Sequence, residues 1–338
     1  MAAPATEPGG PRVLVLRQLG LGDLLASVPA LRGLRTALPG HVVSLACPAP
    51  IGALLREADV VDDVVATGEL RPVPWQGPPP HVGIDLHGNG PASRRLMEAL
   101  RPQRLVGFWS PQLAAWESSP RSGTNGRSGT PRRRYPRGPL WRDHEHESHR
   151  WCRLLATELG AVCDPDDRRL PAPQTPPPAR DVVVVHVGAA SGARRWPADR
   201  FAHVTRELAS EHRVVVTGSA DERRIADRVA SAAELPDADV LAGRTTLDEL
   251  AALVSAARLV ICGDTGVAHL ASAYGRPSVL LFGPTPPARW GPPPGGPHTV
   301  LWHRSDGGDP HAEEPDPALL RITVPEVLDA VAERLRGD

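Results

Sequence analysis

Four segments of the chain place glycine or other small residues, with one or two polar side chains, directly after a run of apolar residues. They are "RQLGLGDLLASVPALRGL", "HVGAASGARRWPADRF", "VVVTGSADERR" and "LVICGDTGVAHL". Each apolar run predicts a buried strand, and the residues that follow predict the beginning of a helix. The first N–H groups of a helix have no partner within it, and the helix dipole adds positive charge there. Such a junction is suited to bind phosphate.

The segment around Gly263-Asp264-Thr265-Gly266 fits this chemistry best. We expect the Thr265 hydroxyl and the N–H groups of Thr265, Gly266 and Val267 to donate to phosphate oxygens. Asp264 is expected to cap the turn, because a carboxylate aimed at phosphate would cost Coulomb energy. His269 follows one helical turn later, on a face that is otherwise apolar.

A second candidate phosphate site follows the apolar run that ends at His186. Small residues, Ala189 and Ala190 among them, let a backbone approach a ligand closely. Arg194 and Arg195 come next; they can hold phosphate oxygens or form a solvated face, and the glycine-rich context favours phosphate. We expect the following tryptophan to pack rather than to stack on a base.

The segment that contains Gly218 ends in two acidic residues, Asp221 and Glu222. An acidic first turn complements the helix dipole, which is one explanation. The other is a carboxylate that accepts ribose hydroxyls, as in other nucleotide-binding folds. Glu222 is our candidate for this role.

The N-terminal segment has a different character. Gly20-x-Gly22 resembles the opening of a dinucleotide fingerprint, but Leu25 stands in place of the third glycine and Asp23 would repel a pyrophosphate. Two interpretations of Asp23 remain open. It caps the helix, or it acts as a general base.

Strands alternate with helices along the whole chain, which predicts an α/β protein with parallel sheets. The pattern restarts after a proline-rich stretch at 171–180. We therefore expect a domain at 11–170, a linker at 171–180, a second domain at 181–323 and a final helix at 324–338. Two such domains would leave a cleft at the carboxyl ends of their strands, where ligands bind.

Composition excludes several classes of function. The formal net charge is −1, which argues against nucleic acid as a partner, and all 38 basic residues are arginine. The four cysteines have no C-x-x-C spacing, so we expect reduced thiols. There is no apolar run of 18 residues and no signal-peptide core, which predicts a cytoplasmic protein without an integral membrane segment. Peripheral contact with a membrane stays open.

Taken together and in this order, the motifs resemble glycosyltransferase family 9, the heptosyltransferase-like enzymes. The most specific match is "GDTGVAHLASAYGRPSVLLFGPTPPARWGP", and "LGLGDLLASVPALRGL", "DLHGN" and "HVGAASGARRWP" also match. The resemblance implies two facing Rossmann-like domains of the GT-B type. It implies an inverting, metal-independent transfer from a nucleotide sugar, ADP-heptose in the known cases, without a bound cofactor.

The resemblance also assigns roles to residues. Asp23 matches the family's proposed catalytic base, and Gly22, His87 and Asn89 fall at acceptor-binding positions. The implied donor-binding residues are Ala189, Ala190, Arg195, Gly218, Glu222, Asp264, Thr265, Gly266 and His269. The arginine-rich stretch at 108–149 departs from the family where acceptor contacts are expected, so the acceptor, a glycan or a small molecule, is left open.

For three other motifs we expect an ordinary structural role and no binding site. "DHEHESHRW" has no standard zinc spacing and predicts an exposed helix start. The Asp-x-Asp at 237–239 follows Leu-Pro and predicts a turn. The arginines at 132–134 predict a solvated loop. Two rival functions also remain, a nucleotide-sugar epimerase of the same fold and a non-catalytic nucleotide-sugar-binding protein.

Overall fold

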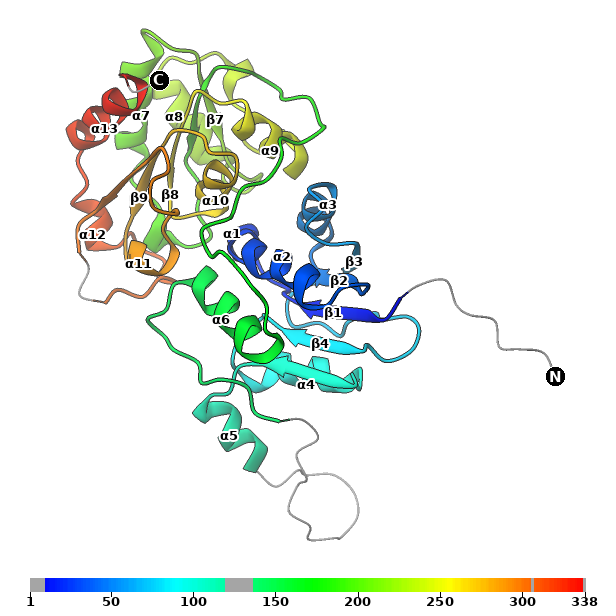
Figure 1. Cartoon of the computed structure of the whole chain (residues 1–338). Helices are drawn as coiled ribbons and strands as arrows, with labels where there is room; N and C mark the ends of the chain where they lie inside the picture. The colour runs from blue at the N-terminus through cyan, green and yellow to red at the C-terminus, as the bar shows by residue number, and fades with distance from the viewer. Residues whose placement is uncertain (1–9, 119–135, 305–306, 337–338) are drawn as a thin grey trace, which may run out of the picture. The chain divides into compact units, whose positions relative to one another are not determined.

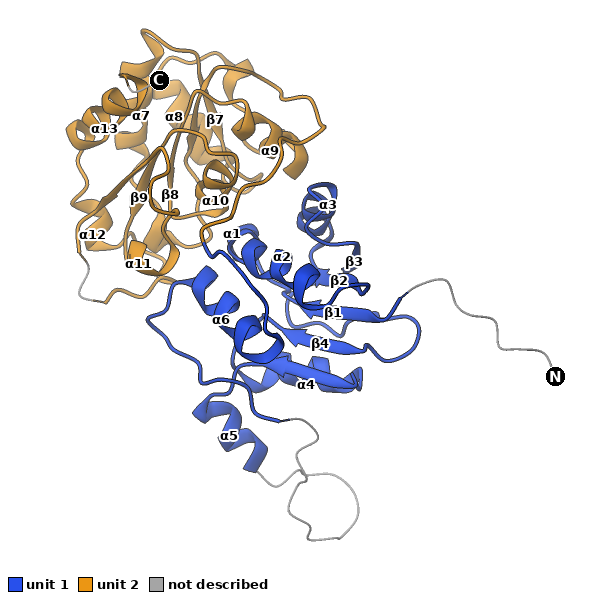
Figure 2. Cartoon of the chain, in the orientation of Figure 1, with its two compact units in different colours: residues 1–165 blue, residues 166–338 orange. Residues whose placement is uncertain are grey.

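A computed structural model describes residues 10–118, 136–304 and 307–336. The chain divides into two compact units, residues 1–165 and residues 166–338 (Figure 2). Each unit is built on its own five-stranded parallel sheet. The predicted α/β class with two Rossmann-like domains is confirmed. The predicted cleft between the domains stays a prediction.

The sheet of the first unit has the strand order β3-β2-β1-β4-β5 (Figure 1). The strands are β1 Arg12–Leu16, β2 Val42–Cys47, β3 Asp63–Ala66, β4 Val82–Asp85 and β5 Arg104–Gly107. The helices are α1 Leu21–Ala26, α2 Val28–Ala37, α3 Ala49–Glu57, α4 Pro91–Ala99, α5 Pro111–Ser118 and α6 Glu147–Leu159. The central strand β1 is buried from Val13 to Leu16, because it is covered on both faces, as parallel sheets require.

The sheet of the second unit has the order β10-β9-β8-β6-β7. Its strands are β6 Val183–His186, β7 Val214–Thr217, β8 Leu259–Gly263, β9 Ser278–Phe282 and β10 His298–Trp302. Its helices are α7 Ala198–Ala209, α8 Arg223–Ala232, α9 Leu247–Ser255, α10 Gly266–Ala273, α11 Pro287–Trp290, α12 Pro317–Leu320 and α13 Val324–Arg336. Two 3₁₀ turns, η1 Gly192–Arg194 and η2 Asp237–Asp239, lie in connections.

The units meet in the sequence at Pro165–Asp166, five residues before the predicted linker. The cause is local bonding. Arg168 is buried and donates to the carbonyl of Gly291 at 2.9 Å, and the N–H of Leu170 donates to the carbonyl of Ala273 at 2.9 Å. Residues 171–180 form neither helix nor strand.

Several boundaries differ from the sequence-based expectation. Helix α1 already begins at Leu21, so Gly22 and Asp23 lie within it rather than before it. The half-buried strand β10 and the short helices α11 and α12 were not expected, because their proline-rich surroundings hide any periodicity. The arginines at 132–134, for which a solvated loop was predicted, lie outside the described residues. Within the described part of the chain, no helix has the length and apolar character needed to cross a bilayer.

Candidate functional site

Each sheet reverses its strand order at one point, and the predicted site residues gather there. In the second unit the reversal lies between β6 and β8, where His186 is paired with Cys262. The loops that leave these two strands at their carboxyl ends therefore start side by side. Ligands of open α/β sheets bind at such a switch point.

The β8–α10 connection forms an open helix start. Thr265 occupies the N-cap position of α10 without a side-chain cap bond, and Asp264 directly precedes it. That Asp264 caps the turn stays a prediction. The N–H groups of Gly266 and Val267 have no intrahelical acceptor, since they lie in the first turn. The Thr265 hydroxyl oxygen is buried next to the thiol of Cys262. The donors that this junction presents are therefore backbone N–H groups rather than the hydroxyl.

The two neighbouring arginines have different partners. Arg194 donates through Nη1 to the carbonyl of Asp264 at 3.3 Å, whereas Arg195 donates through Nε to the carbonyl of Ala189 at 3.0 Å. A Cβ at Gly263 would lie 3.0 Å from the carbonyl oxygen of Arg194, which explains a glycine there. The residue pattern offered both arginines for phosphate and the family resemblance assigned Arg195, whereas the structure places the guanidinium of Arg194 at the start of α10.

Glu222 closes the neighbouring loop. Its Oε2 accepts from the N–H of Ser219 at 2.8 Å, and its carboxylate lies so close to Gly188 that a Cβ there would collide with it. Gly218 lies against the same side chain, where a Cβ would be 3.2 Å from Glu222 Cβ. The carboxylate thus joins the ends of β6 and β7, where the sequence placed a ribose contact.

Sequence reasoning missed His186, at the end of β6. Its Nδ1 lies 3.0 Å from Thr217 Oγ1, and burial lowers its pKa to about 4, against the opposing charge of Glu222. The imidazole is therefore neutral at pH 7. A histidine directly before "VGAASGARR" was the available signal.

Two further predicted donor residues, His269 and Ala190, differ in how far they are exposed. His269 is buried, and its ring packs edge to face on Trp290 of α11 with 5.9 Å between centroids. Ala190 is exposed, whereas Ala189 is buried. Trp196 is also buried, donates to the carbonyl of Ile322 and packs on a phenylalanine, which confirms the packing role.

In the first unit the strand order reverses between β1 and β4, and Asp23 follows β1. Gly20 holds the N-cap position of α1, so Asp23 lies in the first turn and the interpretation as a helix cap is wrong. The reason is that the helix begins before the acidic residue. Gly22 lies in the same half-buried turn.

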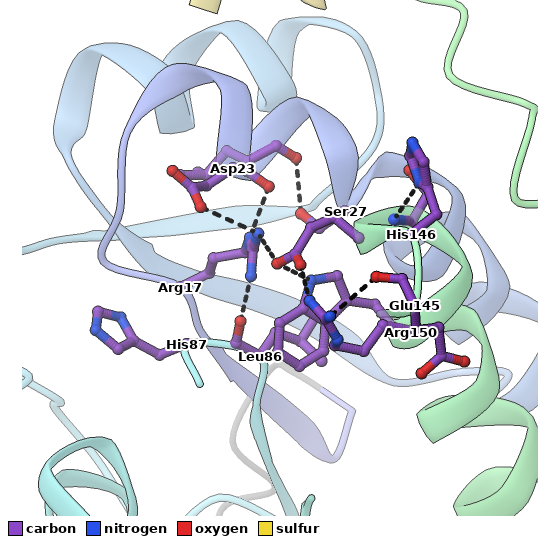
Figure 3. A network of polar contacts seen from close by, with 12 residues as sticks. Arg17, Asp23, Ser27, Leu86, His87, Glu145, His146 and Arg150 are labelled. Atoms are coloured by element: carbon purple, nitrogen blue, oxygen red, sulfur yellow. Dashed lines mark hydrogen bonds and ion pairs between the residues drawn. The ribbon is translucent and has the colours of Figure 1, made fainter. Parts of the chain in front are cut away.

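A buried arginine connects this turn to the rest of the unit (Figure 3). Arg17 is completely buried and donates through Nε to the carbonyl of Asp23 at 2.7 Å. Its Nη1 donates to the carbonyl of Leu86, and its Nη2 donates to Glu147 Oε1 at 3.0 Å. The same Nη2 lies 3.5 Å from Asp23 Oδ1, whose side chain is 31% exposed.

Glu147 is the centre of a second layer of contacts. Its carboxylate also accepts from Arg150 Nη1 and from Trp151 Nε1, the latter at 2.9 Å. Arg150 is itself buried and donates to the carbonyls of Arg142 and Glu145 at 3.1 and 2.9 Å. The expectation of an exposed helix start is thus wrong for Glu147 and Arg150. The sequence did contain a sign of this burial, because Glu147 is followed three and four residues later by Arg150 and Trp151, which both bind its carboxylate.

The acceptor candidates lie at the end of β4. His87 Nδ1 accepts from the N–H of Gln18 at 3.2 Å, and burial, aided by the charge of Arg17, lowers the pKa of His87 to about 4. Asp85 accepts from the N–H of His87 at 3.0 Å, and burial raises the pKa of this carboxyl to about 6. The carbonyl of Asn89 accepts from a serine hydroxyl, so its backbone is held in place.

Residues 159–317 match the family described as "Glycosyltransferase family 9 (heptosyltransferase)". The chain carries a glycosyltransferase family 9 domain. This domain contains every predicted donor-binding residue, from Ala189 to His269. Asp23, Gly22, His87 and Asn89 lie before it.

Relatives of the family 9 domain are similar over part of their length. Lipopolysaccharide heptosyltransferase 2 of Escherichia coli is 32% identical over 146 residues, which are 40% of this chain and 41% of that protein. Lipooligosaccharide heptosyltransferase 2 of Haemophilus influenzae is 34% identical over 113 residues, 32% of this chain and 33% of that protein. The aligned region thus spans less than half of these curated relatives.

Solved structures extend the likeness of fold to the whole chain. A family 9 glycosyltransferase from Veillonella parvula superposes with a TM-score of 0.73 at 18% identity, covering 99% of this chain and 100% of that one. The E. coli ADP-heptose heptosyltransferase II superposes with a TM-score of 0.71 at 19% identity, covering 96% and 99%. The fold of the chain is therefore of the GT-B type.

The Asp-x-Asp of the family 9 domain is a turn, as predicted. Asp237 pairs with Arg223 and Arg244, at 3.0 and 2.9 Å, and Asp239 pairs with Arg213 at 2.7 Å. These carboxylates are bound by arginines. Among the residues that the structure describes, no three His, Cys, Asp or Glu side chains gather as a metal site.

Proposed function

We propose that the protein is an inverting, metal-independent glycosyltransferase that moves a heptose from ADP-heptose to an acceptor hydroxyl. Two kinds of comparison support this donor. Similar proteins are named lipopolysaccharide heptosyltransferases, and E. coli heptosyltransferases of the same fold were solved with ADP and with ADP-2-deoxy-2-fluoro heptose. The acceptor is not assigned.

The β8–α10 junction is the observation that carries the proposal. It offers the N–H groups of Gly266 and Val267, the positive end of the α10 dipole and the guanidinium of Arg194 in one place. Preorganised donors of this kind stabilise negative charge that develops on a leaving group. Arginine and helix donors would thus do the work that a divalent cation does in other transferases.

The mechanism is a single displacement at the anomeric carbon. Asp23 takes the proton of the acceptor hydroxyl as the oxygen attacks, and the bond from the anomeric carbon to the phosphate oxygen breaks. The nucleoside diphosphate leaves with the electron pair, and its charge is held by the α10 start and by Arg194 and Arg195. Attack opposite to the leaving group inverts the configuration of the sugar.

Titration with a panel of nucleotides and nucleotide sugars, read by calorimetry, tests the donor. ADP-heptose and ADP are expected to bind, and release of ADP is expected only when an acceptor is present or, slowly, with water. A protein that binds none of the panel contradicts the proposal. Conversion of the donor to an isomer without acceptor would indicate an epimerase, and binding that never leads to ADP release would indicate a non-catalytic binding protein.

A further inference from the structure

One buried guanidinium holds both polar loops at the switch point of the first unit. Arg17 contacts the carbonyl of Asp23 in α1 and the carbonyl of Leu86 in the β4–α4 loop (Figure 3). We propose that Arg17 is a positioning residue. It holds the proposed base, Asp23, at a fixed distance from the β4–α4 loop, which carries the acceptor candidates His87 and Asn89, and Glu147 orients the guanidinium of Arg17. This inference rests on the proposed function.

The cost of burying Arg17 argues against a purely structural role. The side chain is 0% exposed and directly follows four buried apolar residues of β1, Val13 to Leu16. A buried ion pair is often no more stable than apolar residues of the same volume. Packing alone would be satisfied by another aliphatic side chain. What only arginine supplies here is a planar fork that reaches acceptors on three separate elements.

Arg17 contacts both the backbone carbonyl and the side-chain carboxylate of Asp23, at different distances. The bond from Nε to the backbone carbonyl is short, at 2.7 Å, whereas Nη2 lies 3.5 Å from the carboxylate. Arg17 therefore fixes the position of the turn more firmly than it binds the carboxylate. The Asp23 side chain remains 31% exposed, as a group that must meet a substrate requires.

Glu147 competes with Asp23 for the same nitrogen. Its Oε1 takes Nη2 of Arg17 at 3.0 Å, and the indole of Trp151 and Nη1 of Arg150 hold the carboxylate in that place. Without this acceptor, Nη2 would move toward Asp23 and shorten the 3.5 Å contact with the carboxylate of the base. Glu147, 130 residues away in sequence, thus keeps Arg17 as a clamp on the backbone of the turn.

The contact with the carbonyl of Leu86 also fixes the β4–α4 loop, which carries the acceptor candidates. Leu86 directly precedes His87, and the backbone of Gln18, next to Arg17, donates to His87 Nδ1. A shift of the guanidinium would therefore move the base and the acceptor loop relative to each other. A misplacement of about 1 Å in such a constellation is enough to cost on the order of 100-fold in rate.

The test compares Arg17→Lys and Glu147→Gln with matched controls. Arg17→Lys keeps the charge and removes the fork. Arg12→Lys removes a fork at the other end of the same strand, where Arg12 bonds Ser44 and Asp63. Glu145→Gln matches Glu147→Gln, because the carboxylate of Glu145 pairs with Arg153 near the same helix start.

The readouts are the rate of ADP release from ADP-heptose, with the acceptor found by screening or with water, the Kd for ADP and the melting temperature. We expect Arg17→Lys and Glu147→Gln each to lower kcat about 10- to 100-fold, by loss of alignment, while Kd and donor KM stay within about twofold. The double variant should be no slower than the slower single one, because both changes act on one contact. Both controls should keep wild-type kcat.

Three outcomes would overturn the inference. An Arg17→Lys protein with kcat within about twofold of wild type removes the positioning role. A fall in kcat that is matched by lower ADP affinity or by partial unfolding shows a merely structural role. Effects that multiply in the double variant show that Glu147 does not act through Arg17. A wild-type protein that releases no ADP with any acceptor rejects the proposed function itself, and that result is separate because it precedes every variant.

Discussion

Arg194 Nη1 lies 3.3 Å from the carbonyl oxygen of Asp264, although the two residues are 70 positions apart in the sequence. The contact brings the loop after β6 to the first turn of α10, across the switch point of the sheet. Arg195, the next residue, donates instead to the carbonyl of Ala189 within its own loop. The side chains of the two arginines are therefore held by carbonyls of two different loops, on either side of the proposed diphosphate site.

Arg195→Ala is expected to weaken the binding of ADP or UDP by about 1.5–3 kcal/mol, the scale of a charged hydrogen bond. Arg194→Ala should cost a similar amount and also loosen the loop. Calorimetry with the purified variants measures both. Arg200→Ala is the control, because Arg200 donates to the carbonyls of Leu320 and Ile322 and should leave nucleotide affinity unchanged. Unchanged affinity in Arg195→Ala would reject its placement at the diphosphate.

Asp23→Asn is expected to lower turnover by roughly 100-fold or more, since the amide has the shape of the acid but cannot accept the proton. Nucleotide affinity and melting temperature should barely move. The structure removes the competing explanation of a lost helix cap, because Gly20 holds that position. Full transfer activity in the Asn variant would end the assignment of Asp23 as the base.

Treatment with EDTA is expected to leave transfer activity intact. The expectation follows from the proposed charge stabilisation by Arg194, Arg195 and the α10 start. Rates measured with EDTA and with added Mg²⁺ or Mn²⁺ check it. A strict requirement for either cation would count against the mechanism. The Asp-x-Asp carboxylates, Asp237 and Asp239, are paired with arginines and so are not expected to bind the cation.

The free energy of unfolding should fall as the pH is lowered from about 6.5 to about 4, and His186 should contribute to this fall. Its pKa is about 4 in the folded protein and near 6.5 when unfolded, so the unfolded chain binds the proton first. The loss from one such group is roughly 3 kcal/mol across that window. Denaturant unfolding of His186→Gln at several pH values should show a flatter dependence. Wild-type dependence in the variant would contradict the assignment.

The opposite sign holds for Asp85, which is why His186 is the clearer probe. Burial raises the pKa of Asp85 to about 6 in the folded protein, so its contribution to stability increases as the pH falls through that value. A global acid titration of the wild type mixes these two effects with that of His87, whose pKa burial also lowers to about 4. The single histidine variant separates them.

The sequence alone determined the α/β architecture, whereas the chemistry that it predicts at the strand ends stays a prediction. Apolar runs such as 183–186 and 259–263 became buried strands, and the helices between them followed, because the period of burial is written into local sequence. The glycine-rich junction at Gly263–Gly266 was predictable for the same reason. A strand that ends in small residues before a helix leaves the same N–H groups in any context.

Only the tertiary structure decided which side chains meet. Arg17 and Glu147 are 130 residues apart, and nothing near either one in sequence indicates the other. Local pattern also could not choose between Arg194 and Arg195, because their direction depends on carbonyls supplied by two different loops. The place of Asp23 in the first turn was also not predictable, because local pattern did not show that α1 begins at Leu21. Periodicity specifies elements, whereas long-range contacts between the ends of those elements specify a site.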